Sequence, residues 1–166
     1  RVFPHIDFKA ITALNGMAAK SFILAGLIDS KYGKVGEEVL DNLLAKHFDG
    51  EFLYRYSAND TVSHIKGYLE DYAYLADALL ESYTATFSNK RLKECETIVE
   101  KALELFFADD AWMYSDDEFR GEDEIFDNAY PSSAAVMTSV LFRLVAAGKT
   151  EYEKHLNLTV QKYGQK

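Results

Sequence analysis

Residues 67–83, with the sequence GYLEDYAYLADALLESY, decide the fold. Apolar and small side chains occur around almost the whole circumference of the helix that this stretch predicts. Only a helix surrounded by neighbours can bury side chains in nearly every direction. Two carboxylates, Glu70 and Asp71, stand at its start. The stretch therefore predicts an inner helix whose first turn carries polar groups.

Two other stretches have the same character. Residues 11–28 are apolar at almost every position and rich in Ala, Leu and Met, which favour helix over strand. A third predicted inner helix runs from about Ser132 to Ala147 and ends at Gly148. Each is followed by a segment with a single apolar stripe, within residues 37–48, 92–106 and 152–163. The sequence thus alternates inner helices with amphipathic outer helices.

The connectors between these pairs contain short aromatic runs. Residues 52–57 predict either a small hairpin or an irregular loop. Trp112 to Tyr114 form a second aromatic run, which an acidic loop at residues 116–127 follows. Asn15, Asp71 and Ser133 lie near the starts of the inner helices, roughly 55 to 60 residues apart, whereas ankyrin and tetratricopeptide repeats have periods near 33 to 34. We predict an all-α fold of three αα-hairpins, with short extended or loop insertions, forming part of an (α/α)6 toroid.

Composition limits the classes of partner. The chain has 166 residues, 48% hydrophobic content and a formal net charge of -9, which indicate a globular, acidic protein. Nucleic acid and anionic membranes are disfavoured as partners because binding them needs clustered Lys and Arg. The apolar stretches are too short to span a bilayer, which takes about 20 residues. The lone Cys95 permits no internal disulfide and favours a reducing, cytoplasmic location.

The start of the chain, Arg1-Val2-Phe3-Pro4, has neither an initiator Met nor the pattern of a signal peptide. We expect residues 1–166 to be a single domain that is a fragment, about half a toroid, of a longer chain. An open set of inner helices would leave an apolar flank, so self-association of the fragment is also expected.

Three motifs resemble a known family. Residues 9–16 (KAITALNG), 67–75 (GYLEDYAYL) and 127–133 (DNAYPSS) are similar, in order and spacing, to the C-terminal region of thioredoxin-domain-containing proteins related to the spermatogenesis-associated thioredoxin-like protein. The family usually has Trp at the position of Leu14, and Gly-Asn at Ser133-Ala134. The resemblance implies a six-hairpin toroid similar to N-acylglucosamine 2-epimerases and several glycosidases. It also implies a thioredoxin-like domain in the full-length chain as a partner.

In such a toroid a sugar would bind where the starts of the inner helices converge. This nominates Asn15, His64, Glu70, Asp71, Tyr72, Tyr74, Asp127, Ser132 and Ser133. Asp71 is the candidate general acid or base, with Asp127 as its second carboxylate, since adjacent residues on a helix diverge and Glu70 is poorly placed to pair with it. His64 is a weaker candidate.

Each of these residues also has a structural explanation. The carboxylates Glu70 and Asp71 would be stabilised by the positive end of the helix dipole, and Ser132 and Ser133 would cap a helix. His64 could be an ordinary loop histidine. The acidic loop could hold calcium, but it lacks the alternation of an EF-hand and is better explained as a solvated charge run.

The sequence contains no Cys/His set with zinc spacing, no glycine-rich phosphate loop and no Gly-x-Ser-x-Gly motif, so no metal and no cofactor are predicted. Two functions stay open. One is a carbohydrate-binding or carbohydrate-active domain with epimerase-like or glycosidase-like chemistry. The other is a non-catalytic scaffold whose concave face docks a thioredoxin-like domain or a partner protein.

Overall fold

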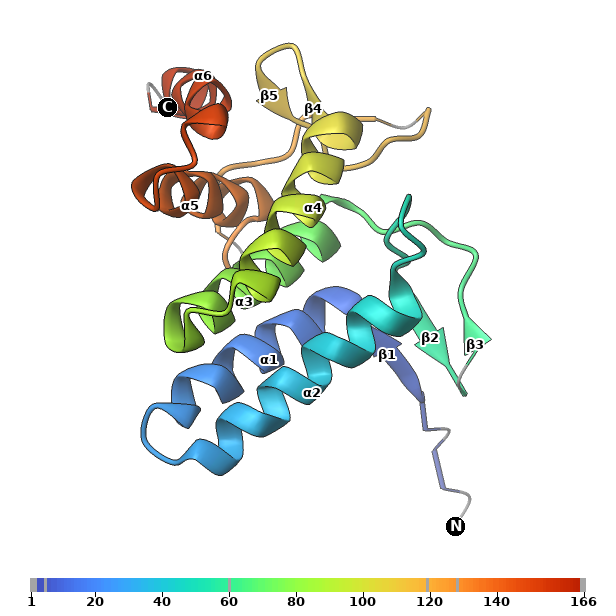
Figure 1. Ribbon diagram of the computed structural model, residues 1–166. Coiled ribbons are helices and arrows are strands. Elements are labelled where there is room, and N and C mark those ends of the chain that lie inside the picture. Colours follow the sequence, from blue (N-terminus) through green and yellow to red (C-terminus); the bar gives the residue numbers. More distant parts are fainter. Residues whose placement is uncertain (1–2, 5, 60, 119, 128, 165–166) are drawn as a thin grey trace.

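The computed structural model describes residues 3–4, 6–59, 61–118, 120–127 and 129–164, and most of them are helical (Figure 1). The elements follow one another as β1 (Lys9–Ile11), α1 (Thr12–Gly26), α2 (Ser30–His47), β2 (Tyr56–Ala58), β3 (Thr61–Val62), α3 (Leu69–Thr86), α4 (Asn89–Phe106), β4 (Phe107–Ala108), β5 (Ala111–Trp112), α5 (Ser133–Ala146), the 3-10 turn η1 (Thr150–Tyr152) and α6 (Glu153–Tyr163). The predicted inner and outer helices are confirmed. Helix α2 begins at Ser30, earlier than the predicted stripe at residues 37–48, and includes Gly33 and Gly36.

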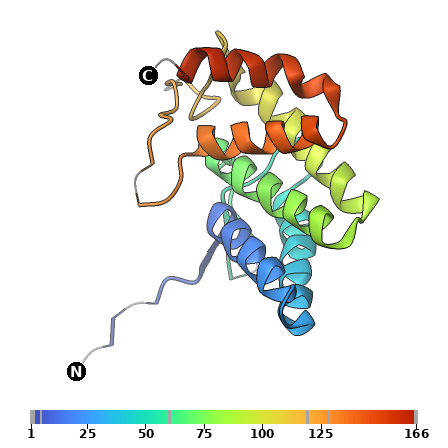
Figure 2. The ribbon, with the colours of Figure 1, turned by 90° about the vertical axis from the view of Figure 1, so that its left-hand side faces the viewer.

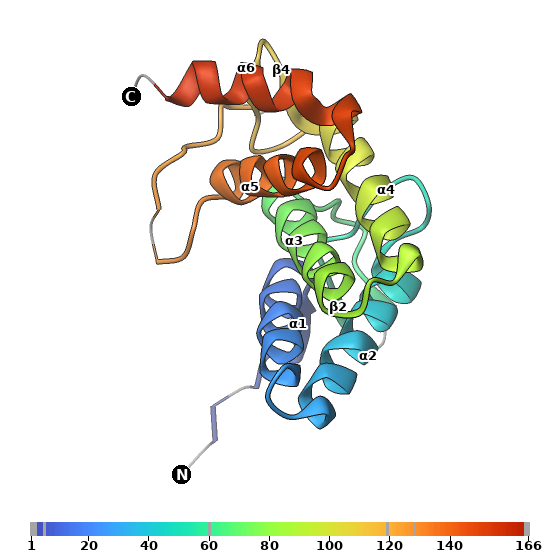
Figure 3. The ribbon, with the colours of Figure 1, turned by 60° about the vertical axis from the view of Figure 1, so that its left-hand side comes forward.

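The helices pair as three αα-hairpins, α1 with α2, α3 with α4, and α5 with α6. Helix α3 also packs against both α1 and α5, so α1, α3 and α5 form one layer (Figure 3). Helices α2 and α4 cover the other side of α1 and α3. This arrangement is the inner and outer pairing that the hydrophobic patterns predict.

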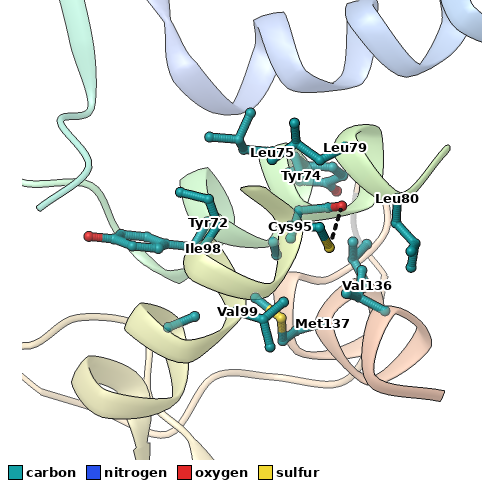
Figure 4. Packing of buried hydrophobic residues seen from close by; sticks show 14 of the residues in the cluster. Tyr72, Tyr74, Leu75, Leu79, Leu80, Cys95, Ile98, Val99, Val136 and Met137 are labelled. Atoms are coloured by element: carbon teal, nitrogen blue, oxygen red, sulfur yellow. Dashed lines mark hydrogen bonds between the residues drawn. The ribbon is translucent and has the colours of Figure 1, made fainter. Parts of the chain in front are cut away.

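Helix α3 lies at the centre of the core. Twelve of its residues are buried, among them Leu75 and Leu79, which pack in the same cluster as Ile98 of α4 and Met137 of α5 (Figure 4). Gly16 allows α1 to approach closely, because a Cβ atom there would lie 2.9 Å from the Tyr74 carbonyl oxygen. Burial on nearly all sides explains why most positions of α3 are apolar or small.

Helix α1 departs from the prediction that it is packed all round. Leu14 is 50% exposed and Leu24 is 43% exposed, although α1 is an inner helix. It packs against α2 and α3, and its remaining flank has no neighbour in the described part of the chain (Figure 2). The uniform apolar pattern therefore predicts the inner position of α1 correctly and its complete burial wrongly.

The aromatic connectors form small antiparallel sheets. Strand β2, from the run at residues 52–57, pairs with β1 and with β3, and the second connector forms the β4–β5 hairpin. The choice between hairpin and irregular loop is thus resolved in favour of strands. Among the described helices, none combines the length and apolar character needed to cross a bilayer.

Candidate functional site

A cavity of about 400 Å³ opens between the starts of α3 and α5, and we call it the α3–α5 cavity. It is lined by a mixture of carboxylates, aromatic rings and hydroxyls: Arg55, Glu70, Tyr114, Asp123, Glu124, Phe126, Ala129, Tyr130, Pro131, Ser132 and Ser133. The long connector between β5 and α5 supplies most of these residues. The cavity therefore lies at the starts of two of the three inner helices, and its lining contains no residue of α1.

Glu70 reaches this cavity from the first turn of α3. Its Oε1 atom lies 2.6 Å from Nη1 of Arg55, and its Oε2 atom accepts a long 3.4 Å hydrogen bond from the Tyr130 hydroxyl. The Arg55 guanidinium in turn stacks over the Tyr68 ring, 4.7 Å from its centroid. Glu70 is thus held in one orientation while its carboxylate still borders open space.

Asp123 supplies a second carboxylate to the same cavity. Its Oδ2 atom accepts hydrogen bonds from Oγ of Ser133 at 2.5 Å and from the backbone N–H of Ala134 at 3.1 Å, which satisfies donors at the start of α5. Burial raises the pKa of Asp123, the Ser133 and Ala134 bonds oppose this rise, and the nearby charge of Glu70 adds to it. Two carboxylates in different environments therefore share one cavity, which is the arrangement that acid–base chemistry uses.

Asp71, the predicted acid or base, occupies a different environment from its neighbour. Its side chain is fully buried, and its oxygens accept bonds from the backbone N–H groups of Ala13 and Tyr68 and from Arg55, each at 3.0 Å. Burial raises the pKa of Asp71 to about 6, although Arg55 and the two backbone donors lower it. Asp71 joins the starts of α1 and α3, and its predicted catalytic role stays a prediction.

The tyrosines of α3 also separate. Tyr72 is fully buried against Phe106, and its hydroxyl oxygen accepts the backbone N–H of Leu53. Tyr74 donates its hydroxyl proton to the carbonyl oxygen of Pro131 and lines a second cavity of about 450 Å³. Both tyrosines are buried, but Tyr74 also forms part of the wall of a cavity.

This second cavity, the inner-helix cavity, contains side chains from α1, α3 and α5. Asp127 lines it as an exposed residue, with Oδ1 accepting the backbone N–H of Ser132. Pro131 lines both this cavity and the α3–α5 cavity, so the two cavities adjoin at the segment before α5. The structure does not place Asp127 and Asp71 in one cavity.

The other predicted site residues are dispersed. Ser132 and Ser133 line the α3–α5 cavity, and Oγ of Ser132 caps α5 by accepting the Ala135 N–H. Asn15 donates its side-chain amide to the Ile11 carbonyl and borders a third cavity, next to β2. His64 is exposed in the loop before α3 and lines none of the three cavities.

Sequence reasoning missed Arg55, Asp123 and Tyr130. Tyr130 lies two residues before the predicted cap Ser132, which is a usable signal, and Arg55 is the single cation of the aromatic run at residues 52–57. Asp123 lies in the acidic loop at residues 116–127, which the sequence pattern predicts to be a solvated charge run. Its partial burial follows from the fold. Among the described residues, no group of three or more His, Cys, Asp or Glu side chains is placed to hold a metal ion.

Comparison with known proteins adds fold information. No protein-family model matches the sequence, and no curated protein matches it. A GH76 α-mannanase from Bacteroides thetaiotaomicron is similar in structure with a TM-score of 0.71 and 15% sequence identity, over 96% of this chain and 41% of the mannanase. The cellobiose 2-epimerase of Spirochaeta thermophila is similar with a TM-score of 0.73 and 12% identity, over 95% of this chain and 44% of the epimerase.

The chain folds as part of an α/α toroid. An unsaturated glucuronyl hydrolase specific for heparin gives a TM-score of 0.72 at 17% identity, over 96% of this chain and 48% of that protein. The chain thus spans less than half the length of each of these three structures. At such low identities the likeness establishes the three-hairpin architecture alone.

Proposed function

We propose that this toroid domain binds a carbohydrate in the α3–α5 cavity and that Glu70 and Asp123 act on it. The observation that carries the proposal is the pairing of two partly buried carboxylates with the rings of Tyr114 and Tyr130 in one cavity. Carboxylates accept hydrogen bonds from sugar hydroxyls, and aromatic rings cover the apolar faces of sugar rings. The sugar-processing activities named for the structural neighbours support the same substrate class.

The two carboxylates suit different roles. Asp123 has a raised pKa, which favours a general acid that donates a proton to a leaving oxygen or ring oxygen. Glu70 is paired with Arg55 and suits a negatively charged group that stabilises developing positive charge or acts as a base. Asp71 is a positioning residue in this proposal, because it fixes Arg55, which in turn fixes Glu70.

The test is thermal unfolding of the chain against a panel of neutral mono- and disaccharides and uronic acids. A ligand at about 100 times its dissociation constant adds roughly 2.7 kcal/mol of stability. We expect a rise in melting temperature for one sugar class, lost in Glu70→Gln and Asp123→Asn and kept in the control Glu118→Gln, which removes an exposed charge from the same acidic loop. A shift that survives both cavity variants, or no shift with any sugar, would refute the proposal.

A scaffold function is the second candidate, and a specific surface favours it. Leu27 is 69% exposed and Ile28 is 94% exposed at the end of the α1–α2 hairpin, beside the uncovered flank of α1. Exposed apolar clusters of this kind commonly mark contact surfaces. The partner would be a second copy of the chain, a partner protein or, following the motif resemblance, a thioredoxin-like domain.

Light scattering over a range of concentrations separates these outcomes. Self-association through this surface predicts a mass that grows with concentration and returns to the monomer value in Leu27→Ser/Ile28→Ser. The control is Ile65→Ser, which replaces an exposed apolar residue in the loop before α3. A monomer at all concentrations would remove the second copy as partner, and pull-down with a thioredoxin-like domain would then decide between the remaining two.

A further inference from the structure

Beside β2 lies a hydrogen-bonded chain of three side chains that the proposed sugar site does not use. His47, the last residue of α2, has Nδ1 at 2.7 Å from Oγ1 of Thr12 and Nε2 at 3.0 Å from Oγ of Ser57. Thr12 is the first residue of α1, and Ser57 lies in β2. The elements α1, α2 and β2 thus bring the Thr12 hydroxyl, the His47 imidazole and the Ser57 hydroxyl within hydrogen-bonding distance of one another in that order.

The hydrogen bonds fix which ring nitrogen carries the proton. Thr12 has one hydroxyl proton and donates it to the Tyr54 carbonyl oxygen at 2.6 Å, so its oxygen must accept a proton from Nδ1 of His47. In the neutral imidazole, Nε2 then carries a lone pair and accepts the Ser57 hydroxyl proton. This is the tautomer that a general base needs when it activates a serine.

The surroundings keep this imidazole neutral and give it access to a ligand. His47 is only 2% exposed, and burial together with the charge of Lys46 lowers its pKa, so the neutral base persists at neutral pH. Ser57 and His47 both line a cavity of about 460 Å³, the β2 cavity. Its other walls combine apolar side chains with Lys46 and the amides of Asn42 and Asn59.

We propose that Ser57 and His47 form a nucleophile–base pair that transfers a short acyl group from an ester to water in the β2 cavity. The Ser57 oxygen attacks the ester carbonyl carbon while its proton passes to Nε2 of His47. The C–O bond to the alcohol breaks, and the alcohol leaves with that proton. Water then attacks the acyl-serine, gives a proton to His47, and releases the acid as Ser57 regains its proton.

The other polar groups have supporting roles. Thr12 is a positioning residue, because it holds the ring through Nδ1 and fixes the tautomer. The Lys46 ammonium and the Asn59 amide line the same cavity and are the groups suited to stabilise negative charge on the carbonyl oxygen. Thr12 carries no charge, so the imidazolium formed during attack gains less stabilisation than an aspartate would give, and slow turnover is expected.

The first experiment treats the chain with a fluorophosphonate, which forms a covalent adduct with an activated serine and releases fluoride. Intact mass and peptide mapping should locate one adduct on Ser57, absent in Ser57→Ala and retained in Ser139→Ala, a control serine that lines the inner-helix cavity. General-base catalysis contributes about 10² to 10⁴-fold, so His47→Gln should slow labelling by at least that lower factor. Labelling elsewhere, or none at Ser57, would overturn the proposal.

A second measurement guards against loss of the fold in His47→Gln. Hydrolysis of p-nitrophenyl acetate by the wild-type chain should follow a single deprotonation below pH 6.5, since the His47 pKa is lowered, and Ser57→Ala should abolish it. Thr12→Val should reduce the rate and leave the labelled residue unchanged. A rate equal in Ser57→Ala would show that the three side chains only join α1, α2 and β2.

Discussion

The first turn of α3 has two sides that differ in what they do. On the buried side, the Asp71 carboxylate accepts hydrogen bonds from two backbone N–H groups and from Arg55. The bond from the Ala13 N–H joins α3 to α1. On the cavity side, Glu70 shares the same Arg55 but borders open space opposite Asp123. Adjacent carboxylates with similar sequence signals therefore serve packing in one case and a candidate site in the other.

This difference shows how a toroid can combine stability with an open cavity. The carboxylate that holds the helices together is withdrawn from solvent, and its bonds to backbone donors make it costly to remove. The carboxylate beside it is oriented by the same arginine and remains available to a ligand. Arg55 thus contacts both carboxylates. Substitution of Asp71 should mainly lower stability, whereas substitution of Glu70 should mainly affect binding.

The largest effect should come from removing the buried carboxylate. Asp71→Ala leaves the N–H groups of Ala13 and Tyr68 without an acceptor and Arg55 with one partner fewer, so we expect the free energy of unfolding to fall by about 3 to 5 kcal/mol. Urea unfolding measures this directly. Glu70→Ala, on the cavity side, should cost about 1 kcal/mol. Equal losses of unfolding free energy in Asp71→Ala and Glu70→Ala would contradict the distinction between a buried side and a cavity side.

The sequence predicted the architecture well because hydrophobic periodicity follows from burial. The all-round apolar pattern of residues 67–83 identified the central inner helix, and the single stripe on α4 identified an outer one. Each pattern depends on many side chains, so a single residue that departs from it does not change the predicted position of the helix. The incomplete burial of α1 escaped prediction because Leu14 and Leu24 look the same in sequence whether or not a neighbouring helix covers them.

The candidate site was only partly predictable. Glu70, Ser132 and Ser133 were placed by their position at helix starts, and the α3–α5 cavity contains all three. The angular position of each residue around the helix axis decides whether its side chain faces a cavity or the core. Asp71 and Tyr72 face the core and are fully buried. Asp123 and Ser57 lie in connectors whose path depends on tertiary contacts, so local sequence gave no measure of their burial or partners.

The pH dependence of stability should sharpen the comparison. Asp71 has a pKa of about 6 in the folded chain against an ordinary aspartate value of 3.8, so the folded chain binds this proton more tightly than the unfolded one. The resulting stability is complete below pH 3.8 and is lost as the pH rises through 6. One pKa unit corresponds to about 1.4 kcal/mol, so the loss should be about 2 to 3 kcal/mol.

Asp71→Asn isolates this contribution because other carboxylates titrate in both chains and cancel in the difference. Its amide nitrogen cannot accept the Tyr68 N–H or the Arg55 bond, so the variant should be less stable than wild type at pH 4. The gap between them should narrow toward pH 7. Glu70→Gln, measured in parallel, reports the cavity side. A gap that widens with pH would mean that attraction to Arg55 outweighs burial.

The smallest effect on stability should arise on the cavity side, at Tyr130. Its hydroxyl makes a long 3.4 Å bond to Glu70 and the residue is half-exposed, so Tyr130→Phe should change the free energy of unfolding by less than about 0.5 kcal/mol. If the ring covers a bound sugar, Tyr130→Phe should keep the sugar-induced thermal shift and Tyr130→Ala should reduce it. A shift unchanged in Tyr130→Ala would exclude the ring from binding. If Tyr130→Phe instead lowered the free energy of unfolding as much as Asp71→Ala does, Tyr130 would be part of the packed core. A side chain that contributes so much to packing is not available to a ligand.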